Sequence, residues 1–213
     1  GEKKRNYEIT KNEHKMGLHG SFTCEVVYEN SKAKLIGKPH NGFRYMLHLM
    51  NEARIAVGLQ SLGGIEACLS YAKNYALERE QFGKNLMDHP LYARNMHDWE
   101  TERDAFRALM VDTLTHFDIY QKLDLFKRHG KELTAEQEKM YKNAKKWTRR
   151  RTPLVKMYGA ETFTHLSQRA IQALGGYGFI EEYDVSRFHR DSFAPLLYEG
   201  TSQIQALMAM KDL

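Results

Sequence analysis

Glu199 and its neighbours offer the clearest chemistry in the sequence. Tyr198-Glu199-Gly200-Thr201 places a carboxylate between an aromatic residue and a glycine, just ahead of an expected helix start. A carboxylate held beside a substrate carbon can act as a base that removes a proton from it. Gly200 would let the backbone approach a ligand closely, and the helix start that holds Thr201 and Gln203 suits an anion. Taken alone, most glutamates in such a place are simply solvated.

Two further motifs suit a phosphate or a nucleotide. Gln172 precedes Gly175 and Gly176, whose missing side chains let the backbone approach a diphosphate. Glu78-Arg79-Glu80-Gln81-Phe82-Gly83 contains an arginine, and a guanidinium can bind one phosphate through two hydrogen bonds. Each motif has a plainer interpretation. The glycines could only end a helix, and the arginine could only lie at the negative end of a helix dipole.

Composition bounds the kind of protein. The chain has 213 residues, of which 42% are hydrophobic and 28% charged, as in an ordinary soluble globular protein. No apolar run approaches the roughly 18 residues of a membrane span. Cys24 and Cys68 form no disulfide framework or zinc spacing, so we expect a reducing, cytoplasmic compartment and no metal. The net charge of +5 suits an anionic ligand or weak nucleic-acid contact.

The elements that must position these residues are mostly helical. Alternating residues over 22–28 predict a strand, and 37–42 a loop. Apolar residues at three- and four-residue steps predict a helix from Phe43 to about Glu80 and a second from about Tyr92 to Arg128.

The rest of the sequence predicts three more helices. Thr134 and Gln137 form a capping box that opens the third, and Pro153 begins or kinks a fourth, which ends at Leu174. Ser202 and Gln205 form a second capping box that opens the last. Long helices with short loops predict a mainly α fold, an antiparallel up-down bundle preceded by a short β segment. We therefore expect residues 1–36 to be the tail of a β-domain and residues 37–213 to be the helical domain.

In combination these motifs resemble those of the acyl-CoA dehydrogenase family. The stretch 170–205 resembles the family's C-terminal signature, and the resemblance extends from about Lys15 to Leu213. It implies an enzyme that binds FAD and oxidises an acyl-CoA thioester to the trans-2-enoyl-CoA. In that reaction Glu199 takes the α proton, flavin takes the β hydride, and an electron-transfer flavoprotein takes the electrons. It also implies that an N-terminal helical domain and most of the β-domain are absent, so that this fragment alone is inactive.

The resemblance implies a role for each motif residue. Arg79 would pair with the FAD pyrophosphate of a neighbouring subunit, in a homodimer or homotetramer. Arg54 would contact CoA, although a surface salt bridge is its plainer interpretation. The family's second position for a base is held here by Ala53, which supports Glu199 as the sole base. The remaining expected ligand contacts are Gln81, Phe82, Gln172, Gly175, Gly176, Thr201 and Gln203 for FAD, and Tyr198 and Gly200 for the substrate.

The basic run 145–151 leaves other functions open. Residues 149–156, Arg-Arg-Arg-Thr-Pro-Leu-Val-Lys, resemble a larger bacterial subgroup with an extra domain, one member of which binds DNA. The alternative function is thus a non-catalytic, flavoprotein-like module whose basic helix contacts nucleic acid, although a solvated face or a subunit contact is the plainer interpretation of this run. A third possibility is a helical domain that only mediates oligomerisation. Arg190-Asp191 is another family landmark, for which we expect a structural role.

Overall fold

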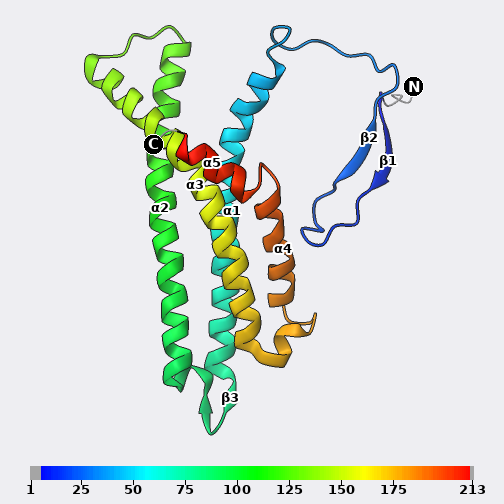
Figure 1. Ribbon diagram of the computed structural model, residues 1–213, viewed down its shortest axis with the longest axis vertical. Helices are drawn as coiled ribbons and strands as arrows, with labels where there is room; N and C mark the ends of the chain where they lie inside the picture. Colours follow the sequence, from blue (N-terminus) through cyan, green and yellow to red (C-terminus); the bar gives the residue numbers. More distant parts are fainter. Residues whose placement is uncertain (1–5, 212–213) are drawn as a thin grey trace.

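Three long helices build the molecule, which we describe from a computed structural model over residues 6–211. Helices α1 (Gly42–Glu78), α2 (Pro90–Arg128) and α3 (Ala135–Leu174) run antiparallel in sequence order (Figure 1). Helix α4 (Val185–Leu197) packs against α1 and α3, and α5 (Ser202–Met210) lies across α3. The prediction of a mainly α, up-down bundle is confirmed.

The bundle is held by an apolar core in which two glycines allow close helix packing. Phe106 of α2 and Phe163 of α3 are buried, and each ring faces a glycine of a neighbouring helix. A Cβ on Gly64 would lie 2.2 Å from Phe163 Cζ, and one on Gly159 would lie 2.3 Å from Phe106 Cζ. The core therefore requires glycine at both positions. Its other fully buried members include Ile65, Leu69, Met110, Val155 and Leu166.

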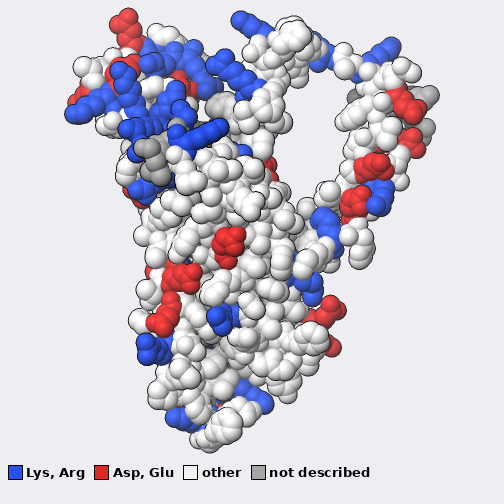
Figure 2. Space-filling model, in the orientation of Figure 1, with Lys and Arg blue, Asp and Glu red and all other residues white. Residues whose placement is uncertain are grey.

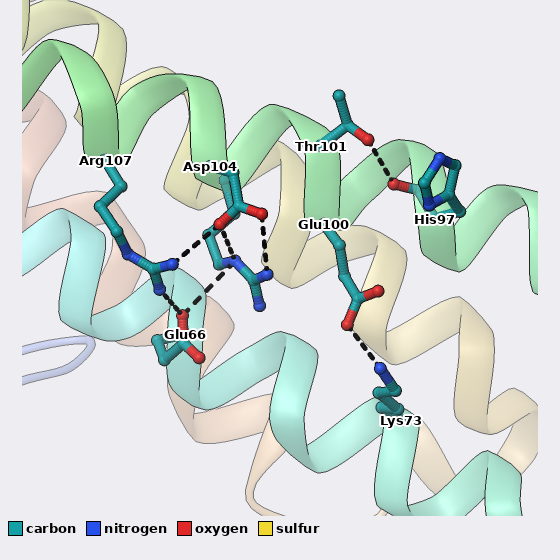
Figure 3. Close-up of polar contacts among 8 residues, drawn as sticks. Glu66, Lys73, His97, Glu100, Thr101, Asp104 and Arg107 are labelled. Carbon is teal, nitrogen blue, oxygen red and sulfur yellow. Dashed lines mark hydrogen bonds and ion pairs between the residues drawn. The ribbon is translucent and has the colours of Figure 1, made fainter.

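Ion pairs line the outer seam between α1 and α2 (Figure 3). Glu66 of α1 accepts a hydrogen bond from Arg107 of α2 at 2.7 Å, and Lys73 reaches Glu100 at 2.8 Å. Pairs this exposed contribute about 0–1 kcal/mol each. They therefore contribute little to the stability of the bundle, which depends on its apolar core.

The β segment stands apart from the bundle (Figure 1). Strands β1 (Glu8–Asn12) and β2 (Cys24–Val27) form one antiparallel pair, so the predicted strand at 22–28 is shorter, and β1 was not predicted. Phe22 is 84% exposed, since nothing among the described residues covers this face. Asp191 of α4 accepts a hydrogen bond from the Leu18 amide at 2.6 Å, which gives Asp191 a structural contact.

The first helix ends earlier than predicted. After Glu78 the chain forms a small hairpin, β3 (Glu80–Gln81) and β4 (Lys84–Asn85), and then a 3-10 turn, η1 (Leu86–Asp88). None of these three elements was predicted, because each is only two or three residues long. The hairpin turn is tight, with both Phe82 and Gly83 at positive φ.

The predicted break at Pro153 is wrong as a helix start, since α3 continues through it. A proline inside a helix removes the hydrogen bond that its own amide would donate, and its ring crowds the carbonyl four residues earlier, here that of residue 149. Pro153 is buried in the bundle, and this packing offsets the loss. The capping box at the beginning of α3 is confirmed, with the Gln137 amide 3.2 Å from Thr134 Oγ1 and the Thr134 amide 3.0 Å from Gln137 Oε1.

The C-terminal helices differ most from expectation. Residues 175–179 form a 3-10 turn, η2 (Gly175–Phe179), and α4 was not predicted. The capping box proposed for Ser202 and Gln205 is wrong, because Thr201 is the N-cap and makes no side-chain cap bond. Ser202 Oγ donates instead to Glu161 of α3, and the Gln205 amide binds the loop before α5. Both polar side chains therefore bind other parts of the chain and do not cap α5.

Adjacent glycines in α1 give a matched test of this packing. We expect Gly64→Ala to destabilise the fold by about 1–3 kcal/mol, because the new methyl overlaps the Phe163 ring. Gly63→Ala should stabilise it by about 0.5–1 kcal/mol, since Gly63 is exposed and nothing lies within 4 Å of its added Cβ. Denaturant unfolding of both variants measures the difference. Equal effects at the two positions would contradict the packing described here.

Candidate active site at the Glu199 loop

The loop between α4 and α5 holds Glu199 in an unusual backbone conformation. Glu199 has φ 59° and Gly200 has φ 100°, both in the left-handed region. A side chain on Gly200 would be strained at that φ, and its Cβ would lie 2.7 Å from Gln205 Nε2. Such a conformation persists only where the surroundings enforce it, and functional sites concentrate such strain.

Three helices supply the hydrogen bonds that enforce this conformation. Arg54 Nε of α1 donates to the Glu199 carbonyl at 3.1 Å. Gln205 Nε2 of α5 lies 2.9 Å from the same oxygen and 3.1 Å from the Gly200 carbonyl. Lys156 Nζ of α3 donates to the Gly200 carbonyl at 2.5 Å. All three donors are buried, so the loop is fixed from beneath by the bundle itself.

The Glu199 carboxylate is left free by these contacts. Its Oε2 atom is buried and has no hydrogen-bond partner among the described residues. A buried polar atom without a partner is uncommon and calls for an explanation. An oxygen that must accept a proton from a bound substrate is one such explanation. The neighbouring Tyr198 hydroxyl donates to Gln60 and does not approach Oε2 as a partner.

Burial shapes the electrostatics around the loop. It lowers the pKa of Arg54, an effect that the nearby Glu199 charge opposes. Burial and the positive charge of Arg54 lower the pKa of Lys156. Burial and the charge of Glu199 raise the pKa of the Tyr198 hydroxyl. The carboxylate is thus near enough to Arg54 and Lys156 for their charges to interact, and it is adjacent to a phenol that stays protonated at neutral pH.

Other carboxylates of α1 do not share this site. Position 53 is an alanine, and the adjacent Glu52 accepts a hydrogen bond from Gln121 of α2 at 2.8 Å. Arg54 Nη1 donates to Asn51 Oδ1 at 2.9 Å, so its guanidinium bridges Asn51 and the Glu199 loop. It is buried, and the surface salt bridge considered for it does not form.

A second group of predicted residues lines a cavity at the other end of the bundle. The cavity has a volume of about 620 Å³ and brings together Arg79, Gln81, Gln172, Gly175 and Gly176. No atom lies within 4 Å of a Cβ added to either glycine. The Arg79 guanidinium lies 5.4 Å from the centre of the Tyr177 ring and makes no ion pair with any residue between 6 and 211.

Phe82, Thr201 and Gln203 lie outside this cavity. Phe82 is 94% exposed at the tip of the β3–β4 hairpin, and Thr201 and Gln203 are exposed at the start of α5. Arg54 and Arg79 are 25 residues apart along α1, which is roughly 37 Å at 1.5 Å per residue. The predicted residues therefore form two groups: one lies on and beside the loop that joins α4 to α5, and the other lies at the ends of α1 and α3 near the β3–β4 hairpin (Figure 1).

Sequence reasoning missed two residues that build the site, Lys156 and Gln205. Lys156 lies on the buried face of α3 beside Val155 and is 0% exposed. A lysine on an apolar helix face was a signal that could have identified it, since lysine is almost never fully buried without a partner. Gln205 was assigned to a capping box and so was not considered further.

A second cavity, of about 450 Å³, opens beside the N-terminal half of α1, near Arg54. Asn51, the partner of Arg54, lies in its wall with Lys145 and Arg149 of α3. Thr148 Oγ1 also lines it and is buried without a hydrogen-bond partner among residues 6–211. The cavity therefore combines positive charge with a free hydroxyl, a combination that suits an anionic ligand.

Much of the basic run is bound into the bundle. Trp147 Nε1 and Arg151 both bind Asp112 of α2, at 3.0 and 2.9 Å, and the Arg151 guanidinium stacks over the Trp147 ring. Lysine and arginine side chains gather where α2 ends and α3 begins (Figure 2). In the described part of the chain no group of acidic, histidine or cysteine residues could hold a metal ion, and no helix is long and apolar enough to cross a bilayer.

Comparison with known proteins identifies the family of this chain. The profile described as "Acyl-CoA dehydrogenase, C-terminal domain" matches residues 40–213. An acyl-CoA dehydrogenase of Bacillus subtilis is 30% identical over 210 residues, which are 97% of this chain and 49% of that protein. A caffeyl-CoA reductase–Etf complex subunit of Acetobacterium woodii is 31% identical over 97% of this chain and 48% of its own length.

A solved structure agrees with these relatives. Butyryl-CoA dehydrogenase from Megasphaera elsdenii is 28% identical and superposes with a TM-score of 0.77, over 97% of this chain and 48% of that one. The chain thus spans about half the length of the relatives it matches. From its fold and its sequence, this chain belongs to the acyl-CoA dehydrogenase family and contains the family's C-terminal domain.

Proposed function

We propose that this chain is the C-terminal part of an FAD-dependent acyl-CoA dehydrogenase that converts an acyl-CoA thioester to the trans-2-enoyl-CoA. The observation that carries the proposal is the buried, unpartnered Oε2 of Glu199 on a loop fixed by three helices. In this proposal Glu199 removes the proton from the carbon next to the thioester carbonyl. FAD, when bound, supplies the acceptor for the hydride that leaves the β carbon.

The proton transfer relies on how this chain holds the carboxylate. Glu199 can accept a proton because no hydrogen bond among the described residues occupies Oε2. Arg54 and Lys156 bind backbone carbonyls rather than the carboxylate, so they orient the base and leave its reacting oxygen open. Tyr198 and Gly200, on either side of Glu199, are proposed to line the thioester.

The cavity near the β3–β4 hairpin is the proposed site for the FAD nucleotide. Arg79 would pair with the pyrophosphate, because it has no ion-pair partner among the described residues. Gly175 and Gly176 present bare backbone, and Gln81 and Gln172 offer side-chain amides for polar contacts. Phe82 at the exposed hairpin tip would contact the nucleotide from outside the cavity.

The two groups of residues are too far apart to hold one cofactor within one chain. Thr201 and Gln203 lie next to Glu199, whereas Arg79 lies roughly 37 Å away along α1. Each chain would therefore contact the flavin end of one FAD and the nucleotide end of another. This arrangement requires a homodimer or a homotetramer with FAD at the subunit interface.

The CoA part of the substrate is assigned to the Arg54 end of α1. Arg54 and Asn51 join the Glu199 loop to the wall of the 450 Å³ cavity, where Lys145 and Arg149 add positive charge. This charge would attract the phosphates of CoA. The basic run thereby acquires a role in substrate binding. Trp147 is bound by Asp112 and Arg151, and the Arg151 guanidinium already covers one face of its ring, which disfavours nucleic-acid stacking there.

The proposal also includes a protein that accepts the electrons and a cellular location. The relative from Acetobacterium woodii is named as part of a complex with Etf, and we propose an electron-transfer flavoprotein as the electron acceptor here. Cys24 and Cys68 form no disulfide, which favours a reducing cytoplasm as the proposed location. The isolated chain should be inactive, because it spans about half the length of its relatives.

Replacing the base tests the reaction. In the intact, flavin-loaded enzyme, Glu199→Gln should slow anaerobic flavin bleaching by acyl-CoA about a hundredfold to ten-thousandfold, because the amide cannot accept the proton. A series of acyl chain lengths ranks the substrates in the same experiment. Glu182→Gln, at an exposed glutamate, is the matched control and should bleach at the normal rate. Rapid bleaching by the Glu199 variant would rule out Glu199 as the base.

Removing one guanidinium tests the shared cofactor. Arg79→Ala should weaken FAD binding by about tenfold to a hundredfold and also weaken subunit association, since it loses a charge-assisted contact at the interface. Flavin content after gel filtration and mass by light scattering measure both effects. Arg94→Ala, at an arginine whose side chain is 80% exposed, is the control. Normal flavin content in the Arg79 variant would exclude this cavity as the nucleotide site.

A further inference from the structure

A fully buried lysine lies directly beneath the Glu199 loop. Lys156 of α3 is 0% exposed, and its Nζ lies 2.5 Å from the Gly200 carbonyl and 3.4 Å from the Leu196 carbonyl. Leu196 belongs to the last turn of α4, where backbone carbonyls have no partner within the helix. The ammonium group therefore lies at the negative end of the α4 dipole, a favourable place for a cation.

Burying this cation is costly for the fold. No carboxylate among residues 6–211 lies within ion-pair distance of Lys156, so its charge is balanced by backbone carbonyls and by the more distant Glu161 and Glu199. Burial and the charge of Arg54 lower its pKa. A methionine would fill a similar volume without this penalty, but it would not donate to the Leu196 and Gly200 carbonyls. The lysine is therefore retained for what these two contacts hold together.

The geometry of the loop offers a reason. Lys156 joins the end of α4 to Gly200, and Gln205 joins Gly200 to the carbonyl of Glu199. These contacts fix the peptide groups that follow the Glu199 Cα, and so they fix the direction in which its side chain leaves the backbone. A displacement of about 1 Å in a reacting group can cost about a hundredfold in rate.

We propose that Lys156, together with Gln205, is a positioning residue for proton transfer at Glu199. Lys156 clamps the end of α4 to the Gly200 carbonyl and keeps the carboxylate aimed at the substrate carbon, without itself touching the substrate. This inference rests on the proposed function, since it assigns Lys156 a role in that same reaction.

The test compares Lys156→Met with Lys139→Met, an exposed lysine on the same helix, in the intact flavin-loaded enzyme. The Lys156 variant should keep its flavin and bind acyl-CoA within about threefold of the wild type. Its rate of flavin reduction at saturating substrate should fall by about tenfold to a hundredfold, the loss expected for a charged hydrogen-bond donor. Flavin reduction within threefold of the wild-type rate would overturn the proposal.

A second readout does not depend on turnover. Amide hydrogen exchange of the peptide spanning residues 196–205, measured without substrate, should be faster in Lys156→Met than in the wild type and in Lys139→Met. Unchanged exchange would show that the lysine does not hold the loop, which also overturns the proposal. Should the wild type itself fail to reduce its flavin, the proposed function fails, and this exchange measurement still decides whether the clamp exists.

A second variant tests the proposal if the Lys156 variant does not fold. If Lys156→Met loses its flavin or its fold, the same rate and exchange measurements are made on Gln205→Leu, whose amide binds the same Gly200 carbonyl from α5. A slower rate with faster exchange supports the clamp there as well. A wild-type rate in that variant would overturn it.

Discussion

The hydrogen bonds from Arg54, Lys156 and Gln205 to the backbone of the Glu199–Gly200 loop are the interaction on which the account depends. Left-handed backbone at Glu199 is unfavourable without them, and the carboxylate would then have no fixed direction. The donors come from α1, α3 and α5, so the packed bundle sets the position of Glu199, the proposed base. Glycines at 64 and 159 allow that packing and thus contribute indirectly to the chemistry.

In our proposal, the length of the helices is the reason that two copies of this chain share each cofactor. Helices α1 to α3 each contain 37 to 40 residues. The Glu199 loop contacts Arg54 in the first half of α1 and Lys156 at the middle of α3, whereas the Arg79 cavity lies at the C-terminal ends of α1 and α3. In the proposal, a second copy of the chain therefore places the two groups around one flavin.

Most of the fold was predictable, because long helices leave a strong apolar period, and the motif residues were found from their resemblance to a family. Short elements such as β3, β4 and η1 leave no such period, and tertiary contacts kept α3 continuous through Pro153. Gln205 was misassigned because a capping box and a tertiary hydrogen bond use the same residue types. Lys156 was missed because the local sequence does not show which loop a buried lysine will contact.

A crystal structure of the intact protein with a bound acyl-CoA substrate analogue tests the central claim most directly. The account predicts that a Glu199 carboxylate oxygen lies within hydrogen-bonding distance of the position of the α carbon, while Lys156 Nζ stays on the Gly200 carbonyl. It also predicts that the FAD nucleotide contacts Arg79 of a neighbouring subunit. An analogue whose α carbon lies far from Glu199, or a loop that releases Lys156 when the analogue binds, would contradict it.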